Sequence, residues 1–151
     1  MIISQSVLQY KTKFYILFYE EEVLMSEYGG KITELPEALG NFMPNSSKKV
    51  VFGPTHFWPD YVLRCFDLEP SAGSHEPHTH EWCHWMVVFE GNGIFNIDGK
   101  EYPVERGTWC HVPSGVPHNF YNASDKEHFV FLCIVPPEGD VNPTLAGSKG
   151  C

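Results

Sequence analysis

The sequence predicts an all-β fold in a single domain, an antiparallel sandwich or barrel. Between residues 61 and 135, short segments rich in β-branched and aromatic residues alternate with Gly, Pro, Asn and Asp, at intervals of about 8 to 12 residues or less. The chain has 151 residues, 42% of them hydrophobic and 15% aromatic. This length and composition suit one domain with a sizeable core and leave little room for a second domain.

Seven segments are predicted to be strands. In chain order they are residues 61–69, 84–90, 93–98, 102–105, 108–113, 118–122 and 128–135. Asp98-Gly99 predicts a two-residue hairpin, because glycine tolerates the positive φ of a primed turn. Residues 90–93, Glu-Gly-Asn-Gly, predict a second tight turn. The strands should therefore pair as antiparallel neighbours.

The chain divides into three zones. We expect residues 1–57 to form an N-terminal extension and edge elements, residues 58–140 the barrel core and residues 141–151 a C-terminal tail. Met25 precedes a more ordinary opening, so we expect the first 24 residues to lie outside the core fold. Residues 35–39 are predicted to form a short helical turn that starts at Pro36. Residues 45–47 are predicted to be a polar loop.

Charge and cysteine content exclude several classes of protein. Lys+Arg of 10 against Asp+Glu of 19 gives a net charge of -9, which suits neither a nucleic acid nor an anionic membrane surface. The five cysteines are scattered without a CxxC pair, so neither a disulfide framework nor a zinc ribbon is predicted. The apolar stretch 14–19 is too short to span a bilayer. We therefore expect a cytoplasmic protein without a signal peptide.

Two histidine-containing segments carry the chemistry. Residues 73–91 read GSHEPHTHEWCHWMVVFEG, which places His78 and His80 two residues apart and His84 at the start of a predicted strand. Residues i and i+2 of an extended segment face the same side, so these imidazoles can point together into the barrel. Downstream, residues 107–122 read GTWCHVPSGVPHNFYN, where a Pro-Ser-Gly turn leads to His118 on another strand.

These two segments resemble the two motifs of the cupin superfamily. The second matches G-x5-P-x-G-x2-H-x3-N without a gap, from Gly107 to Asn122. The first has the HxH pair and a closing glycine, but His84 stands where the motif has a carboxylate. The segments 60–70 and 131–139 extend the likeness to small single-domain cupins with four histidines. The resemblance implies a cupin jelly-roll barrel that holds one divalent transition metal ion through His78, His80, His84 and His118.

Four neutral imidazoles constrain that metal site. They leave the full charge of the ion uncompensated, so the site should attract an anionic or enolisable oxygen ligand. Neutral ligands favour Lewis-acid catalysis or oxygen chemistry centred on the substrate. A tetrahedral zinc ion would be closed and structural, whereas octahedral coordination leaves positions for water or substrate. Imidazole suits Mn, Fe, Ni, Cu and Zn alike. Because only neutral imidazole binds metal, we expect occupancy and stability to fall together near pH 6.

Other side chains are candidates for the pocket. Alternation places Met86 and Val88 on the face of His84, and Phe120 on that of His118. The resemblance implies that Arg64, Phe131 and Cys133 line the pocket near the metal. For Phe131, simple core packing is an equally good interpretation. A buried arginine needs an anion, and a substrate carboxylate would serve Arg64. For Cys133, a buried small residue and a metal-side or redox thiol are both open.

Three functions compete. The leading hypothesis is an enzyme that acts on a small, oxygenated, anionic molecule, with dioxygenase ranked above isomerase or lyase by resemblance alone. The alternative is a non-catalytic small-molecule-binding cupin or a metal-stabilised scaffold. A sensor domain of a transcription factor is disfavoured by the lack of a basic patch. The resemblance, together with the need to cover sheet edges, also predicts a homodimer.

Overall fold

The computed structural model describes residues 28–38 and 43–140. The chain splits into two compact units, Met1–Glu34 and Leu35–Cys151. The described part of the first unit contains one short 3-10 turn, η1 (Ile32–Glu34), while every described strand belongs to the second unit. Among the described residues, no helix has the length and apolar character needed to cross a membrane. The predictions for residues 1–24 and for the tail 141–151 fall outside the described residues.

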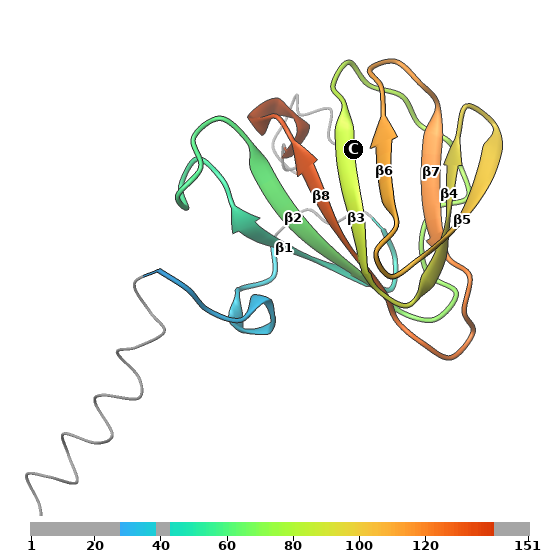
Figure 1. The fold of residues 1–151 in the computed structure, drawn as a ribbon, viewed down its shortest axis with the longest axis horizontal. Helices are drawn as coiled ribbons and strands as arrows, with labels where there is room; N and C mark the ends of the chain where they lie inside the picture. Colours follow the sequence, from blue (N-terminus) through green and yellow to red (C-terminus); the bar gives the residue numbers. More distant parts are fainter. Residues whose placement is uncertain (1–27, 39–42, 141–151) are drawn as a thin grey trace, which may run out of the picture. The chain divides into compact units, whose positions relative to one another are not determined.

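The second unit is built from antiparallel strands. They are β1 (Ser46–Phe52), β2 (Val62–Leu68), β3 (His84–Glu90), β4 (Asn92–Ile97), β5 (Lys100–Glu105), β6 (Trp109–Val112), β7 (His118–Asn122) and β8 (Phe129–Val135), followed by the 3-10 turn η2 (Pro137–Asp140). One sheet has the order β1-β2-β8-β3-β6 and the other β5-β4-β7 (Figure 1). In the five-stranded sheet β1 and β2 are adjacent, but β8 lies between β2 and β3, so the fold is not a simple meander.

The predicted strands are confirmed to within two residues at each end. The predicted hairpin is also present: Asp98 and Gly99 have φ values of 54° and 73°, and they join β4 to β5 with Ile97 opposite Lys100. Both central residues therefore have the positive φ that a primed turn requires. Gly91, with φ of 75°, forms the predicted tight turn between β3 and β4.

The prediction for the stretch before residue 58 was partly wrong. Residues 46 and 47 begin strand β1 instead of forming a loop, and β1 pairs with β2 along the edge of the larger sheet. Residues 35–38 contain no helix, and the single 3-10 turn of this region lies earlier, at η1. Local composition misled us because Ser-Ser-Lys-Lys is a polar sequence, yet Lys48 is buried inside the fold.

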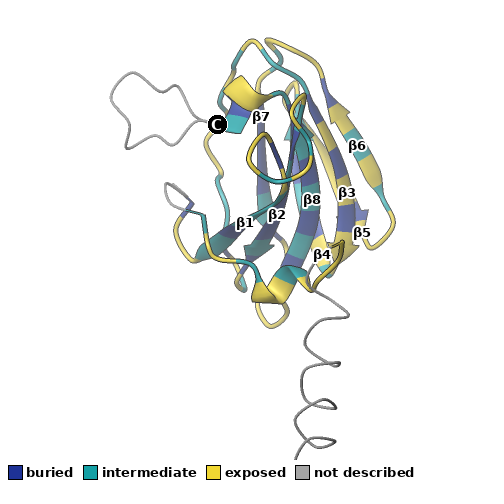
Figure 2. Cartoon of the chain, turned by 90° about the vertical axis from the view of Figure 1, so that its left-hand side faces the viewer, coloured by how far each residue is buried: buried dark blue, intermediate teal, exposed yellow. Residues whose placement is uncertain are grey.

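Alternation along the strands separates an inner from an outer face (Figure 2). In β3, His84, Met86 and Val88 are buried, while Trp85, Val87 and Phe89 are exposed. The expected inward lining by Met86, Val88 and Phe120 is therefore confirmed. Since His84 shares the inner face with this apolar lining, the strand itself aims the imidazole into the barrel.

An aromatic cluster joins the two sheets. It consists of Phe66, Phe95, Phe120, Phe129 and Phe131. Phe131 of β8 is fully buried, and its ring lies 4.9 Å from that of Phe120 on β7 and 5.5 Å from that of Phe95 on β4. These edge-to-face contacts pack the inner faces of the two sheets together. This packing supports the core interpretation of Phe131.

Asn122, which ends β7, fastens three segments together. Its Nδ2 lies 3.1, 2.9 and 2.8 Å from the carbonyl oxygens of Leu68, Glu69 and Glu127, and its Oδ1 accepts a hydrogen bond from Ser124 N at 2.8 Å. The side chain is 4% exposed. The motif position that the sequence identified is therefore a structural hydrogen-bonding hub.

Asn122→Ala should lower the free energy of unfolding by about 2 to 3 kcal/mol, because it strips the donor from buried carbonyl groups. Chemical denaturation measures this change. The control is Asn92→Ala, at an exposed position that starts β4, which should cost less than about 0.5 kcal/mol. Equal losses in the two variants would refute the role assigned to Asn122.

Candidate metal centre

The segment that carries His78 is fixed against β7 by its backbone. His78 N donates to His118 O at 3.0 Å, and His118 N donates to His78 O at 3.0 Å. This pair of hydrogen bonds forms an isolated antiparallel bridge between a loop and the first residue of β7. The two imidazoles therefore start from facing backbone positions, and their ring centroids lie 4.4 Å apart.

His80 is held by contacts of its ring and of its backbone. Its Nδ1 lies 2.9 Å from Trp82 O, and its ring is stacked on the indole of Trp82 at 4.3 Å with an interplanar angle of 10°. Gly115 N donates to His80 O at 2.8 Å, which ties the segment to the turn before β7. A carbonyl oxygen only accepts, so Nδ1 of His80 carries the proton and Nε2 keeps its lone pair.

His84 and His118 begin strands β3 and β7, and each is 2% exposed. Nδ1 of His118 donates to Val116 O at 2.8 Å, which leaves Nε2 as the lone-pair nitrogen. Nδ1 of His84 lies 3.2 Å from the sulfur of Cys133, and its Nε2 lies 2.7 Å from Nε2 of His80. His84 therefore contacts His80, but it lies outside the group of His78, His80 and His118 whose ligand atoms lie close together.

The nitrogens of this cluster have the character of metal ligands. His78, His80 and His118 can each offer one ligand atom, and these atoms all lie within 4.8 Å of one another. Nε2 of His78 and Nε2 of His118 are buried, and neither has a hydrogen-bond partner among the described residues. Buried nitrogens are normally hydrogen-bonded. Two such nitrogens directed at one cluster fit a divalent transition metal ion, for which imidazole is a common ligand.

Burial keeps these imidazoles neutral. It lowers the pKa of His78 and of His80 from 6.5 to about 4, with the neighbouring His118 adding to the effect in both cases. Burial likewise lowers the pKa values of His84 and His118. Neutral imidazole is the form that binds metal, so the folded chain presents the cluster in its ligating form at neutral pH.

The metal-free protein should lose stability as the pH falls from 6.5 to about 4. A histidine whose pKa is lower in the folded chain binds more protons when the chain unfolds, so its contribution is complete above 6.5 and is lost toward the folded pKa. The loss of stability therefore continues to a lower pH than the value near 6 that the sequence led us to expect. Thermal melts of chelator-treated protein test this, and His80→Gln should flatten the dependence. Melting temperatures that stay constant over this range would contradict it.

Known proteins share this fold and part of this sequence. Residues 64–135 match the family model of the cupin domain. The barrel has the cupin fold. An uncharacterised protein of Aquifex aeolicus is 27% identical over 130 residues, covering 83% of this chain and 92% of that protein.

Two solved structures agree with this assignment of the fold. The polyketide cyclase RemF from Streptomyces resistomycificus has a TM-score of 0.63 at 23% identity, covering 79% of this chain and 87% of that one. A sugar phosphate isomerase from Silicibacter pomeroyi has a TM-score of 0.60 at 21% identity, covering 70% and 73%. At these identities the likeness concerns the fold alone.

Arg64 is buried, as expected, but its anion comes from within the chain. The Arg64 guanidinium donates to Gly139 O at 3.0 Å and lies 3.4 Å from a carboxylate oxygen of Asp140. The same oxygen accepts a hydrogen bond from Nζ of Lys48 at 2.9 Å. Asp140 in η2 therefore balances two buried cations from β1 and β2, and contact between Arg64 and a substrate carboxylate stays a prediction.

Asp140, Lys48 and Trp82 were not identified as parts of the site's surroundings from the sequence. Lys48 and Asp140 are 92 residues apart, and no local pattern pairs them. Trp82 packs against the core, and its ring also stacks on His80. The one available signal was the position of Trp82, two residues after His80 within the first motif.

The remaining histidines make their contacts elsewhere, in agreement with their lack of an assigned role. His56 Nδ1 lies 2.6 Å from Val51 O, the ring of His75 lies 4.3 Å from that of Tyr121, and His111 stacks on Trp85 at 5.8 Å. His128 forms an exposed ion pair with Asp67 at 2.7 Å.

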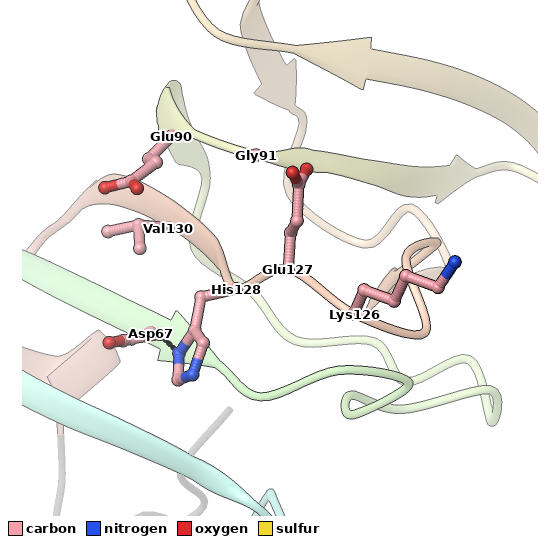
Figure 3. Close-up of a pocket in the computed structure, with 7 residues that line it drawn as sticks. All are labelled: Asp67, Glu90, Gly91, Lys126, Glu127, His128 and Val130. Carbon is pink, nitrogen blue, oxygen red and sulfur yellow. Dashed lines mark hydrogen bonds and ion pairs between the residues drawn. The ribbon is translucent and has the colours of Figure 1, made fainter.

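A separate surface pocket surrounds His128. It is lined by Asp67, Glu90, Gly91, Lys126, Glu127, His128 and Val130 (Figure 3). The neighbouring carboxylates, first of all Asp67, raise the pKa of His128. None of the clustered histidines lines this pocket, so it is an acidic hollow separate from the candidate metal centre.

Proposed function

We propose that this cupin is a metal-dependent enzyme whose His78, His80, His84 and His118 hold one divalent transition metal ion. The observation that carries the proposal is the convergence of four imidazoles whose rings pair at 4.4 to 5.8 Å. The contact of 2.7 Å between Nε2 of His84 and Nε2 of His80 supports the inclusion of His84, since it places both nitrogens where one ion could bind them.

The bound ion would supply Lewis acidity toward an oxygen ligand of the substrate. The chain's own contribution is electrostatic and steric. Its four ligands are neutral at pH 7, because burial lowers their pKa values, so they leave the positive charge of the site uncompensated. The buried apolar side chains of Met86, Val88 and Phe120 exclude water from the inner wall. This combination favours a small, oxygenated, anionic substrate.

We propose dioxygenation as the reaction. Isomerisation and lyase reactions need a side chain that accepts a proton from the substrate. The two acidic residues nearest in sequence to the first motif histidines, Glu76 and Glu81, are exposed, and the buried carboxylate of Asp140 is engaged by Arg64 and Lys48. A site with neutral ligands and no adjacent carboxylate among its described contacts supports oxygen chemistry centred on an electron-rich substrate.

Oxygen consumption tests the reaction. Protein loaded in turn with Mn, Fe, Ni, Cu and Zn is mixed with enolisable acids and phenols in an oxygen electrode, and one metal form should consume one O₂ per substrate molecule. His80→Ala should abolish consumption, whereas His111→Ala, at an exposed position on β6, should retain it. Substrate turnover without oxygen uptake would contradict dioxygenation.

Isomerisation or lyase chemistry is the second candidate. Its support is the fold likeness to solved structures described as a polyketide cyclase and a sugar phosphate isomerase. Incubation of candidate sugar acids in D₂O would reveal such a reaction by deuterium uptake at the carbon beside a carbonyl. A scaffold or a pure binding protein would show neither uptake nor oxygen consumption.

We also propose a cytoplasmic homodimer. Among the described residues, Cys65, Cys83, Cys110 and Cys133 form no disulfide bond, which fits a reducing compartment. β1 is an edge strand of the larger sheet, and edge strands are commonly covered by a partner. Sedimentation velocity checks the assembly: a dimer is expected, and a monomer at micromolar concentration would contradict it.

A further inference from the structure

Cys133 lies between two nitrogen groups next to the metal centre. Its sulfur is 3.1 Å from Nη2 of Arg64 and 3.2 Å from Nδ1 of His84, and the residue is 2% exposed. Strand register produces this arrangement: Cys133 on β8 faces Arg64 on β2 and Met86 on β3. His84 precedes Met86 by two residues and shares its inner face.

The contact to Arg64 defines the role of the sulfur. A guanidinium group only donates hydrogen bonds, so Sγ of Cys133 is an acceptor on that side. Arg64 is itself held in place by Gly139 O and Asp140. An anchored Arg64 on β2 thus holds the sulfur beside His84.

The other histidines show what this sulfur does. Nδ1 of His80 donates to Trp82 O at 2.9 Å, and Nδ1 of His118 donates to Val116 O at 2.8 Å. In both rings, an acceptor on Nδ1 leaves Nε2 directed at the cluster. For His84, Sγ of Cys133 lies 3.2 Å from Nδ1, in the place that corresponds to these carbonyl oxygens.

We propose that Cys133 is a positioning residue, whose sulfur accepts the Nδ1–H of His84 and thereby keeps Nε2 of His84 available to the metal. The inference rests on the proposed four-histidine centre. It gives Arg64 a supporting role through Cys133. Partners of this kind fix the tautomer and orientation of a ligand histidine.

Affinity for Co²⁺, used as the probe metal, tests the role. Cys133→Ala should weaken Co²⁺ binding by about 10- to 100-fold, because loss of an outer partner of a ligand histidine has effects of this size. Cys133→Ser should restore most of the affinity, since a hydroxyl also accepts a hydrogen bond. Cys65→Ala is the matched control: Cys65 is also buried, but it alternates with Arg64 and faces the opposite side of β2. Its Co²⁺ affinity should equal that of the wild type.

The outcomes distinguish a failure of the role of Cys133 from a failure of the proposed metal centre. If Cys133→Ala binds Co²⁺ as tightly as the wild type, the role of Cys133 is refuted, while the proposed metal centre stands. If Ala and Ser variants lose affinity equally, in step with their metal-free melting temperatures, the residue is merely structural and the inference fails. If the wild type binds no Co²⁺, the proposed centre fails and the inference fails with it.

Discussion

His80→Ala is expected to weaken divalent metal binding by at least about 100-fold, more than the loss of an outer-shell partner would. The ligand atom of His80 lies within 4.8 Å of those of His78 and His118, and Nε2 of His80 lies 2.7 Å from Nε2 of His84. Removing this ring takes one ligand from the centre while leaving the backbone bridge between His78 and His118 in place. Titration with Mn²⁺ or Co²⁺ under isothermal calorimetry measures the change.

The control for this experiment is His111→Ala, which makes the same chemical change on the outside of β6. His111 is exposed and contacts Trp85. Its metal affinity should equal that of the wild type. A His80→Ala variant that binds as tightly as this control would show that the histidine cluster does not hold the ion.

Asp140→Asn is expected to cause the largest loss of stability, about 3 kcal/mol, or a drop in Tm on the order of 10 °C. The carboxylate is the shared anion of Lys48 and Arg64, whose side chains are 8% and 3% exposed. Asparagine keeps a hydrogen-bond acceptor but removes the charge, so two buried cations lose their compensation. Because the carboxylate is 14% exposed, the loss should lie at the lower end of the range for broken buried pairs.

Asp67→Asn provides the matched comparison. It removes the same charge from an ion pair with His128 whose side chains are 42% and 53% exposed. An exposed pair contributes less than about 1 kcal/mol, so this variant should melt close to the wild type. Comparable melting temperatures for the two variants would contradict the assigned role of Asp140.

The fold could largely be predicted from the sequence because its signals are local. Alternating apolar residues and the Asp98-Gly99 turn specify strands and a hairpin without knowledge of distant partners. β1 escaped prediction for the opposite reason. Its Lys48 is buried only because Asp140, on η2, neutralises it, and this contact depends on the complete sheet.

In the candidate site, too, local sequence patterns could be predicted and contacts between distant segments could not. The spacing of His78 and His80, together with the motif position of His118, identified three imidazoles that the structure brings together. The sequence also indicated that a buried Arg64 needs an anion. It could not identify Asp140 as that anion, nor the contacts of Cys133 with Arg64 and His84, because these arise from the register of β2, β3 and β8.

The metal content of the purified, folded protein tests the central claim most directly. Elemental analysis after saturation with Mn²⁺ and removal of free metal should find one ion per chain in the wild type and almost none in His80→Ala. The Mn²⁺ form should also enhance water relaxation, as expected if the centre keeps a position open for substrate. A cooperatively folded wild-type protein that retains no metal would contradict the account.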